Sequence, residues 1–216
     1  MQSKNSFVLS MLLVFIFSLT HAQVYLGARI SVNQNNFNGI HPQSKPRIAS
    51  QIGVHSFLKL SEDDNWFLQP EFSYSKQGEY DQPIAPNGTQ MKQRIFLNYL
   101  NVVAFVKYYL SPTKNGMYFE AGPYTAYRIK KRIDLYNFST LADQSTYKNF
   151  DVGGIAGVGF SLNKEWEFSL RYALGALDQI KNPTVKGKAF NSRINLGVSY
   201  SINTTQERLF RGRCKF

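Results

Sequence analysis

The sequence predicts an all-β protein, namely an eight-stranded antiparallel up-and-down transmembrane β-barrel. Three observations support this prediction. The chain begins with a hydrophobic export signal, the rest contains eight segments in which apolar and polar side chains alternate, and the connections between those segments alternate between short and long. Strands joined by short turns at one end and long loops at the other are typical of barrels in bacterial outer membranes.

The N-terminal segment has the three parts of a secretory signal peptide. Lys4 supplies a positive charge, residues 7–20 form an uncharged and mainly apolar stretch, and the small residue Ala22 precedes Gln23. The stretch is shorter than the ~20 residues of a membrane helix, and it ends at a small-residue cleavage site. We therefore expect residues 1–22 to be removed and the mature chain to begin at Gln23. An uncleaved anchor is the alternative.

The mature chain shows the pattern of strands rather than helices. Aromatic and β-branched residues alternate with polar ones, and turn residues separate the segments. Each segment is long enough to cross a bilayer as a tilted strand, which takes about 9–11 residues. The predicted strands span residues 24–33, 47–60, 65–77, 95–110, 117–130, 150–162, 166–176 and 190–202.

The connections predict how the barrel is oriented. The short turns are Ser61–Asp64, Ser111–Gly116 and Asn163–Glu165, and the long loops are residues 34–46, 78–94, 131–149 and 177–189. A barrel over residues 23–202 then has both of its ends on the short-turn side. Since outer-membrane barrels have short periplasmic turns, the long loops are expected outside the cell.

Alternation divides each predicted strand into an apolar and a polar face. In the first strand, Leu26 and Ile30 lie on an apolar face, while Arg29 and Asn33 lie on the other. A soluble barrel such as a lipocalin would bury the apolar face, so alternation alone does not say which face points outward. The aromatic residues decide, because they gather near the strand ends and leave an aliphatic band between them. Two such girdles are typical of a lipid-facing exterior.

Four aromatic residues are expected at the membrane interface on the short-turn side: Trp66, Tyr108, Trp166 and Tyr200. Their amphipathic rings suit the level of the lipid headgroups. The other members of the girdles are Phe119 and Phe160 on the short-turn side and Tyr74, Phe96, Tyr127, Phe150 and Phe190 on the loop side.

The opposite face is charged and is expected to point into the bore, which eight strands leave just wide enough for side chains to fill. Enclosed charges are costly unless they are paired, so we expect ion pairs and hydrogen bonds between carboxylates and cations. A gated ion path or proton relay is the alternative. The expected interior network comprises Arg29, Glu71, Lys107, Glu120, Asp151, Glu167, Arg171 and Arg193, with His55, Lys59 and Arg128 on the same face.

Composition and motifs narrow the function further. The formal net charge of +11 suits an anionic partner, and export favours lipopolysaccharide and anionic phospholipid over nucleic acid.

Cys214 is the only cysteine, so no intramolecular disulfide can form. No residues have metal-ligand spacing, and we expect no metal and no cofactor. The glycine-rich run 153–159 lies within a strand, where it indicates room for bulky neighbours or curvature rather than a phosphate loop.

No catalytic motif is evident in the mature chain. His41 lies in the first long loop and His55 on the interior face, and neither has the spacing of a catalytic triad. We therefore expect a protein that is not an enzyme, with no catalytic residue. An enzyme with its site at the loop rim is the alternative.

Several segments together resemble the PorT-like family of outer-membrane β-barrel proteins. They are Trp66–Gly78, Tyr99–Val102, Lys107–Leu110, Tyr118–Pro123, Phe150–Gly154 and Phe168–Gly175, in the family's order. The resemblance implies an outer-membrane barrel of a Gram-negative bacterium. It also implies a link to type IX protein secretion or gliding, the role of the founding member. The chain departs from the family's pattern by its basic tail, residues 203–216, which we expect in the periplasm, either disordered or docked on a partner or on anionic headgroups.

These expectations favour a non-enzymatic structural or accessory component of the cell envelope. Its expected partners are outer-membrane lipid, lipopolysaccharide and an envelope protein. A small ion or solute pore and a loop-rim enzyme are the alternatives.

Overall fold

A computed structural model describes residues 24–38, 45–81, 92–111, 115–136, 148–163, 165–179 and 188–203. The predicted signal peptide, His41 and the predicted tail beyond Asn203, with Cys214, lie outside these residues. Within the described ranges, no helix is long and apolar enough to cross a membrane.

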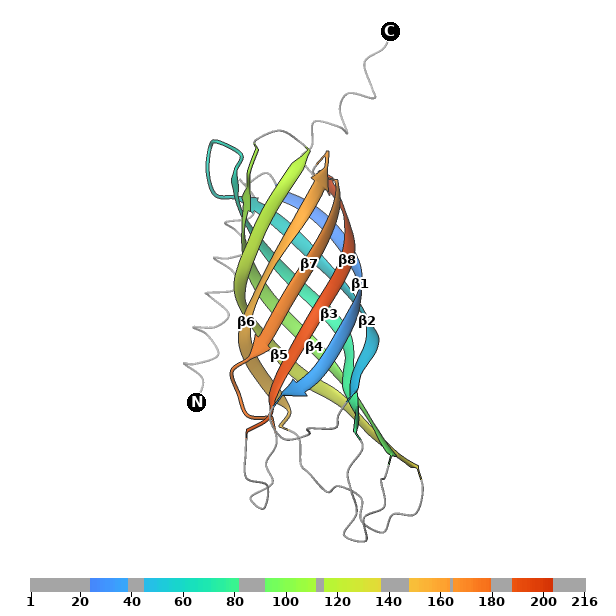
Figure 1. Ribbon diagram of the computed structural model, residues 1–216. Helices are drawn as coiled ribbons and strands as arrows, with labels where there is room; N and C mark the ends of the chain where they lie inside the picture. The colour runs from blue at the N-terminus through green and yellow to red at the C-terminus, as the bar shows by residue number, and fades with distance from the viewer. Residues whose placement is uncertain are drawn as a thin grey trace, which may run out of the picture.

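The described strands form one closed antiparallel barrel (Figure 1). Each strand pairs with its neighbours along the chain, and β1 pairs with β8 to close the ring. This confirms the predicted fold class and all eight predicted strands. The strands are β1 (Val24–Asn38), β2 (Lys45–Lys59), β3 (Trp66–Asp81), β4 (Lys92–Tyr109), β5 (Gly116–Tyr136), β6 (Phe150–Leu162), β7 (Trp166–Gly175) and β8 (Phe190–Asn203).

Short connections mark one end of the barrel, where β1 begins and β8 ends; we call it the turn rim, at the top of Figure 1. Asp64 and Asn163 adopt left-handed backbone with φ of 57° and 55°, a conformation that Asp and Asn tolerate better than most residues. The backbone N–H of Asn163 donates to Oδ1 of Asn115 at 2.8 Å, which links two neighbouring turns. The polar turn residues thus close the hairpins and connect them to one another.

At the opposite end, which we call the loop rim, several strands run further than predicted. β1 continues to Asn38 and β5 to Tyr136. Residues 34–38 read Gln-Asn-Asn-Phe-Asn and lack an apolar face, yet they pair with residues 190–194 of β8. The predicted long loops were therefore too long, because backbone pairing continues beyond the last alternating side chains.

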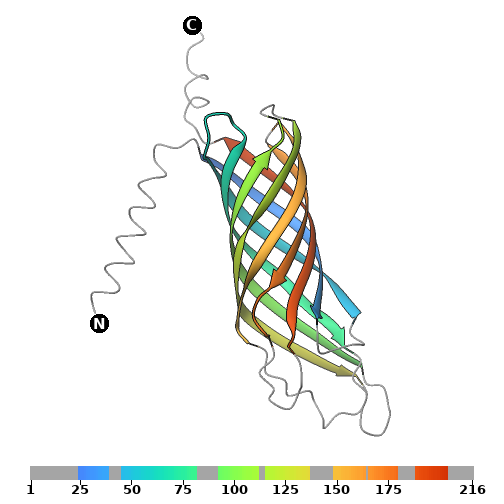
Figure 2. The same cartoon turned by 60° about the vertical axis from the view of Figure 1, so that its left-hand side comes forward.

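The strands β3, β4 and β5 project beyond their neighbours at the loop rim (Figure 2). β5 pairs with β6 only as far as Tyr127 but with β4 as far as Tyr136. Gly78 permits this course: its φ is 127°, and a Cβ atom there would lie 1.9 Å from the carbonyl oxygen of Ile95. We call this projecting sheet the extension; it consists of residues 76–81, 92–98 and 128–136.

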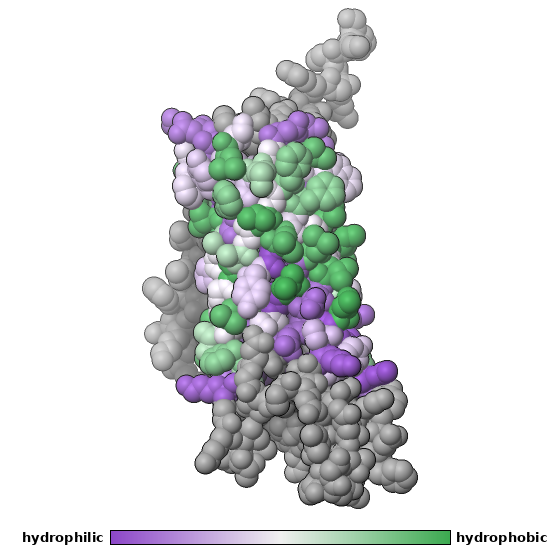
Figure 3. All heavy atoms as spheres, viewed as in Figure 1, coloured by the Kyte–Doolittle hydropathy of each residue, from purple (hydrophilic) through white to green (hydrophobic). Residues whose placement is uncertain are grey.

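The two faces of the barrel wall differ as alternation predicts. Ile30 is 64% exposed and Arg29 1%, and Leu196 is 64% exposed and Asn195 3%. Figure 3 shows hydrophobic side chains over the middle of the wall and hydrophilic ones toward the loop rim. The apolar face therefore points outward and the charged face into the bore, which confirms the predicted orientation of the strands' two faces.

Candidate functional site: the filled bore

A layer of aromatic side chains crosses the bore next to the turn rim. Phe57, Phe67, Tyr109 and Tyr118 are buried, and Tyr25 packs against them. Ring centroids lie 6.4 Å apart for Phe57 and Phe67, 5.4 Å for Phe67 and Tyr109, and 5.2 Å for Tyr109 and Tyr118. Such edge-to-face and tilted contacts stabilise aromatic clusters. A small pocket between Tyr25, Phe57, Phe67 and Tyr109 has a volume of only about 10 Å³.

A buried ionic cluster lies next to this aromatic layer, on the side toward the loop rim. Lys107 Nζ is 2.7 Å from Glu167 Oε2 and 3.6 Å from Glu120 Oε2. Arg171 binds Glu120 through Nε, at 2.6 Å from Oε1, and Glu71 through Nη1, at 2.8 Å from Oε2. All five side chains are at most 2% exposed. The structure thus brings together five of the eight residues expected in the interior network.

The ionic cluster and the aromatic layer are in direct contact. Lys107 Nζ lies 4.3 Å from the ring centroid of Tyr118 and 4.7 Å from that of Phe57. The hydroxyl of Tyr109 donates a hydrogen bond to Glu167. An aromatic ring under a cation and a phenol that donates to a carboxylate both stabilise the buried charge.

Two of these ion pairs join strands that are not neighbours in the barrel and so cross the bore. Arg171 belongs to β7 and Glu71 to β3, and these strands lie opposite each other in the ring of eight. Lys107 on β4 likewise reaches Glu167 on β7. A contact between opposite strands blocks the path along the barrel axis and ties the two walls together.

The other three expected members of the network are bound differently. Arg29 Nη2 donates to Asn195 Oδ1 at 2.7 Å, and Arg193 Nη1 donates to Asn101 Oδ1 at 3.4 Å. Within the described residues neither arginine forms an ion pair, so the expectation of carboxylate partners for them was wrong. Asn195 lies on β8, next to the strand of Arg29, whereas Asn101 lies on β4, opposite the strand of Arg193. Which interior side chains meet depends on the stagger of the strands, which alternation does not reveal.

Asp151 lies further toward the loop rim and was also wrongly expected to pair with a cation. Tyr124 and Gln179 each donate a hydrogen bond to its carboxylate at 2.9 Å, and Asn191 donates a longer one at 3.3 Å. Arg193 stands over the Tyr124 ring at 5.7 Å. Neutral donors therefore satisfy this buried carboxylate among the described residues.

A part of the interior wall is apolar, which the sequence analysis missed. Ile95, Leu97, Tyr99, Phe105 and Tyr124 form a buried cluster on β4 and β5. Arg171 lies 4.2 Å over the Phe105 ring and so joins this cluster to the ionic one. The signal was present in β4, whose residues 95–106 are apolar on both faces at most positions.

His55 lies inside the bore, as expected, and not at a rim. Its Nε2 is 2.9 Å from Ser201 Oγ, and its ring packs edge-on against Phe57 at 5.1 Å. Gly27 makes room for this pair, since a Cβ atom there would lie 2.4 Å from His55 Nε2. The Nδ1 atom of His55 has no hydrogen-bond partner in the described part of the chain. The arrangement thus lacks the third group that orients the base in a catalytic triad.

Two pairs of aromatic side chains lie on the outer surface near the turn rim, at positions expected for the interface. The rings of Trp66 and Tyr108 are 4.7 Å apart and those of Trp166 and Tyr200 are 4.8 Å apart, each at about the same tilt. Both tryptophans are nearly half exposed. Each pair joins directly opposite residues of neighbouring strands.

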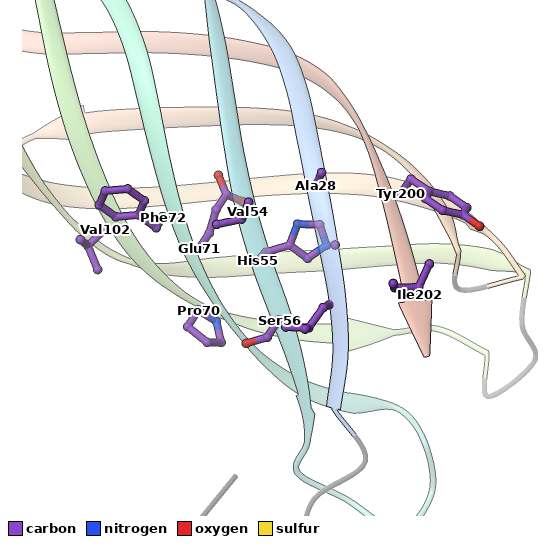
Figure 4. A pocket seen from close by; sticks show the side chains of 12 residues that line it. Ala28, Val54, His55, Ser56, Pro70, Glu71, Phe72, Val102, Tyr200 and Ile202 are labelled. Atoms are coloured by element: carbon purple, nitrogen blue, oxygen red, sulfur yellow. The ribbon is translucent and has the colours of Figure 1, made fainter. Parts of the chain in front are cut away.

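A hollow in the outer surface of β8 and β1–β4 is shown in Figure 4. Val54, Phe72 and Val102 line it and are at least half exposed, whereas His55 and Glu71, drawn in the same view, are buried. The accessible part of the hollow is therefore apolar. Across the described ranges, no group of three or more His, Cys, Asp or Glu side chains is placed to hold a metal ion.

Solved structures share this architecture at low sequence identity. The outer membrane protein OprG from Pseudomonas aeruginosa is 12% identical, with a TM-score of 0.51 over 85% of this chain and 97% of that one. Neisserial surface protein A is 11% identical, with a TM-score of 0.45 over 83% and 97%. The outer membrane enzyme PagL is 9% identical, with a TM-score of 0.47 over 82% and 99%.

At these identities the similarity is one of fold. No curated protein sequence matches the chain. A family match covers most of its length: the outer membrane protein beta-barrel domain matches residues 11–182. The chain therefore belongs to the family of outer membrane protein beta-barrel domains and is a protein of the outer membrane.

Proposed function

We propose that this protein is a closed, non-conducting barrel that serves as a structural or accessory component of the cell envelope and has no enzymatic activity. The observation that carries the proposal is the ion pair between Arg171 and Glu71, which joins opposite strands across the bore. The aromatic layer between this pair and the turn rim adds a second obstruction. A solute or hydrated ion would have to break both layers to pass.

We propose the absence of enzymatic activity because the side chains that could act as base and nucleophile are buried. His55 and Ser201, which are the right types for a base and a nucleophile, are 4% and 0% exposed. Gly27 lies directly against their hydrogen bond, and the hollow in the barrel wall that His55 lines is apolar where it is accessible. A substrate would therefore have to displace packed side chains to reach the pair.

Recordings in planar bilayers test whether the barrel conducts. We expect purified protein, with insertion verified by the shift in gel mobility between heated and unheated samples, to give no stepwise conductance. Reproducible unitary steps from the wild-type chain would contradict a closed bore and favour the pore.

We further propose that the protein serves the machinery of type IX secretion or gliding. The support is the resemblance of segments such as Trp66–Gly78 and Phe168–Gly175 to PorT-like barrels. A strain that lacks the protein is expected to lose secreted proteins from the medium and to spread poorly on a surface, and the wild-type gene should restore both. Normal secretion and normal spreading in the deletion strain would rule this role out.

The arrangement in the envelope forms part of the same proposal. Residues 1–22 are removed on export, the turn rim faces the periplasm and the loop rim faces outward. Trp66, Tyr108, Trp166 and Tyr200 then lie at the periplasmic interface of the outer membrane. The basic tail from residue 203 onward then lies in the periplasm, where it is available to an envelope protein. N-terminal sequencing of the protein isolated from outer membranes is expected to begin at Gln23.

A further inference from the structure

The outward face of the extension changes from apolar to cationic over two steps along the strands. The residues that lie side by side are Tyr74, Leu100 and Tyr127 in the first row, Lys76, Asn98 and Lys130 in the second, and Gly78, Phe96 and Arg132 in the third. Each step is about 7 Å, since a strand rises about 3.4 Å per residue. The first cations, Lys76 and Lys130, thus lie about 7 Å beyond the loop-side aromatic girdle.

Two guanidinium groups meet on one aromatic ring of this face. Arg47 reaches over from β2, and its Cζ lies 4.3 Å from the Phe96 ring centroid. Its Nη1 donates to the backbone oxygen of Gln77 at 2.5 Å, which fixes the group in place. Arg132 approaches the same ring at 5.9 Å and binds Asp134 at 2.8 Å. A guanidinium group that stacks on a ring can also bind an anion through N–H groups at its edge.

Further cations lie on the same surface. Arg94 lies beside the pair, 5.6 Å from the Tyr80 ring. Among the described side chains on the outward face of the extension, Asp134 is the acidic one, and it already binds Arg132. We call this surface the cationic face; it consists of Arg47, Lys76, Arg94, Lys130 and Arg132.

We propose that the cationic face is a binding site for the phosphate groups of lipopolysaccharide, the phosphorylated glycolipid of the outer leaflet. Its place argues for this ligand, because the cations follow directly on lipid-facing aromatic residues of the same strands, at the level where headgroup phosphates lie. Its chemistry agrees, because guanidinium groups bind phosphate oxygens in a bidentate manner. The site goes beyond the proposed closed barrel and depends only on the loop rim facing outward.

Binding of purified lipid A to the full-length barrel in detergent tests the site. The probes are bis-phosphorylated lipid A, the same lipid A after removal of both phosphates, and phosphatidylglycerol, with dissociation constants measured by native mass spectrometry. We expect the phosphorylated form to bind about tenfold or more tightly than either of the others. In the triple variant Arg47→Gln, Lys130→Gln and Arg132→Gln, this preference should disappear.

A matched control separates the site from general charge. The single variant Arg132→Gln should weaken lipid A binding severalfold, whereas Lys59→Gln, which removes one cation from the turn rim, should leave it unchanged. Far-ultraviolet circular dichroism confirms that each variant is folded. The proposal is overturned if dephosphorylated lipid A or phosphatidylglycerol binds as tightly as the phosphorylated form, if the triple variant retains the preference, or if an acidic peptide displaces bound lipid A.

Discussion

The two rims of the barrel differ in charge, in packing and in strand length. At the turn rim, the Ser61–Asp64 turn carries three acidic residues, Glu62, Asp63 and Asp64, and aromatic rings pack in the bore beside this rim. The loop rim carries the extension with its cationic face. The same eight strands therefore end in two different ways. Aromatic side chains fill the bore at the turn rim, and cationic side chains face outward at the loop rim.

The physical basis of the two ends also differs. Near the turn rim, stability rests on side chains that cross the bore, such as Arg171 with Glu71 and Tyr109 with Glu167. At the loop rim, the extension rests on backbone pairing and on the apolar inner cluster around Ile95 and Leu97. Substitutions at the two ends should therefore act on different properties.

The largest effect is expected from breaking the cross-bore ion pairs. Arg171→Met leaves Glu71 and Glu120 buried without their shared cation, and breaking a buried pair in this way costs about 3–5 kcal/mol. Urea titration of the protein in lipid vesicles, followed by the fluorescence of the two tryptophans, measures the free energy of unfolding.

The matched control removes the charges together with their partner. Arg171→Met combined with Glu71→Gln and Glu120→Gln should recover most of the lost stability, since no carboxylate stays buried alone. An Arg171→Met protein as stable as the wild type would show that the ionic cluster does not hold the walls together.

A smaller and more local effect is expected at the loop rim. Gly78→Ala forces a side chain into a positive φ and against the Ile95 carbonyl, at a cost of about 2 kcal/mol. Gly154→Ala is the comparison, because a Cβ atom at Gly154 meets nothing within 4 Å. Hydrogen exchange should show faster exchange in the extension of Gly78→Ala and unchanged protection around the ionic cluster. Uniform loss of protection over the whole barrel would contradict the separation of the two ends.

The smallest effect is expected from the outer aromatic pairs near the turn rim. A double-mutant cycle with Trp66→Ala and Tyr108→Ala should give a coupling energy of about 1 kcal/mol, as for other aromatic pairs. The pair of Trp166 and Tyr200 has nearly the same geometry and should give the same value within error. A coupling energy near zero in both cycles would mean that each ring contributes only through its own contact with lipid.

Most of the fold could be predicted from the sequence, because one property decides it. Period-two alternation in segments such as residues 166–174 specifies strand, face and count at once. It fails where polar residues pair without an apolar face, as in residues 34–38, so the strand ends at the loop rim were placed too early.

The interior could be predicted only in part. Parity showed that Arg29, Glu71 and Arg171 share the inner face, but contacts between opposite strands depend on the stagger of the ring. Arg171 therefore reaches Glu71 on the opposite strand, whereas Arg29 binds Asn195 on the neighbouring strand β8. The aromatic layer was missed because inward rings such as Phe67 alternate with outward girdle residues along the same strand ends.

Cysteine labelling in intact cells tests most directly that the two rims lie on opposite sides of the outer membrane. In a Cys214→Ser background, Lys130→Cys places a thiol on the extension and Glu62→Cys places one at the turn rim, both at exposed positions. We expect a maleimide that cannot cross membranes to label Lys130→Cys in intact cells, and Glu62→Cys only after the outer membrane is opened. Labelling of Glu62→Cys alone in intact cells, or of both variants equally, would contradict the proposed orientation.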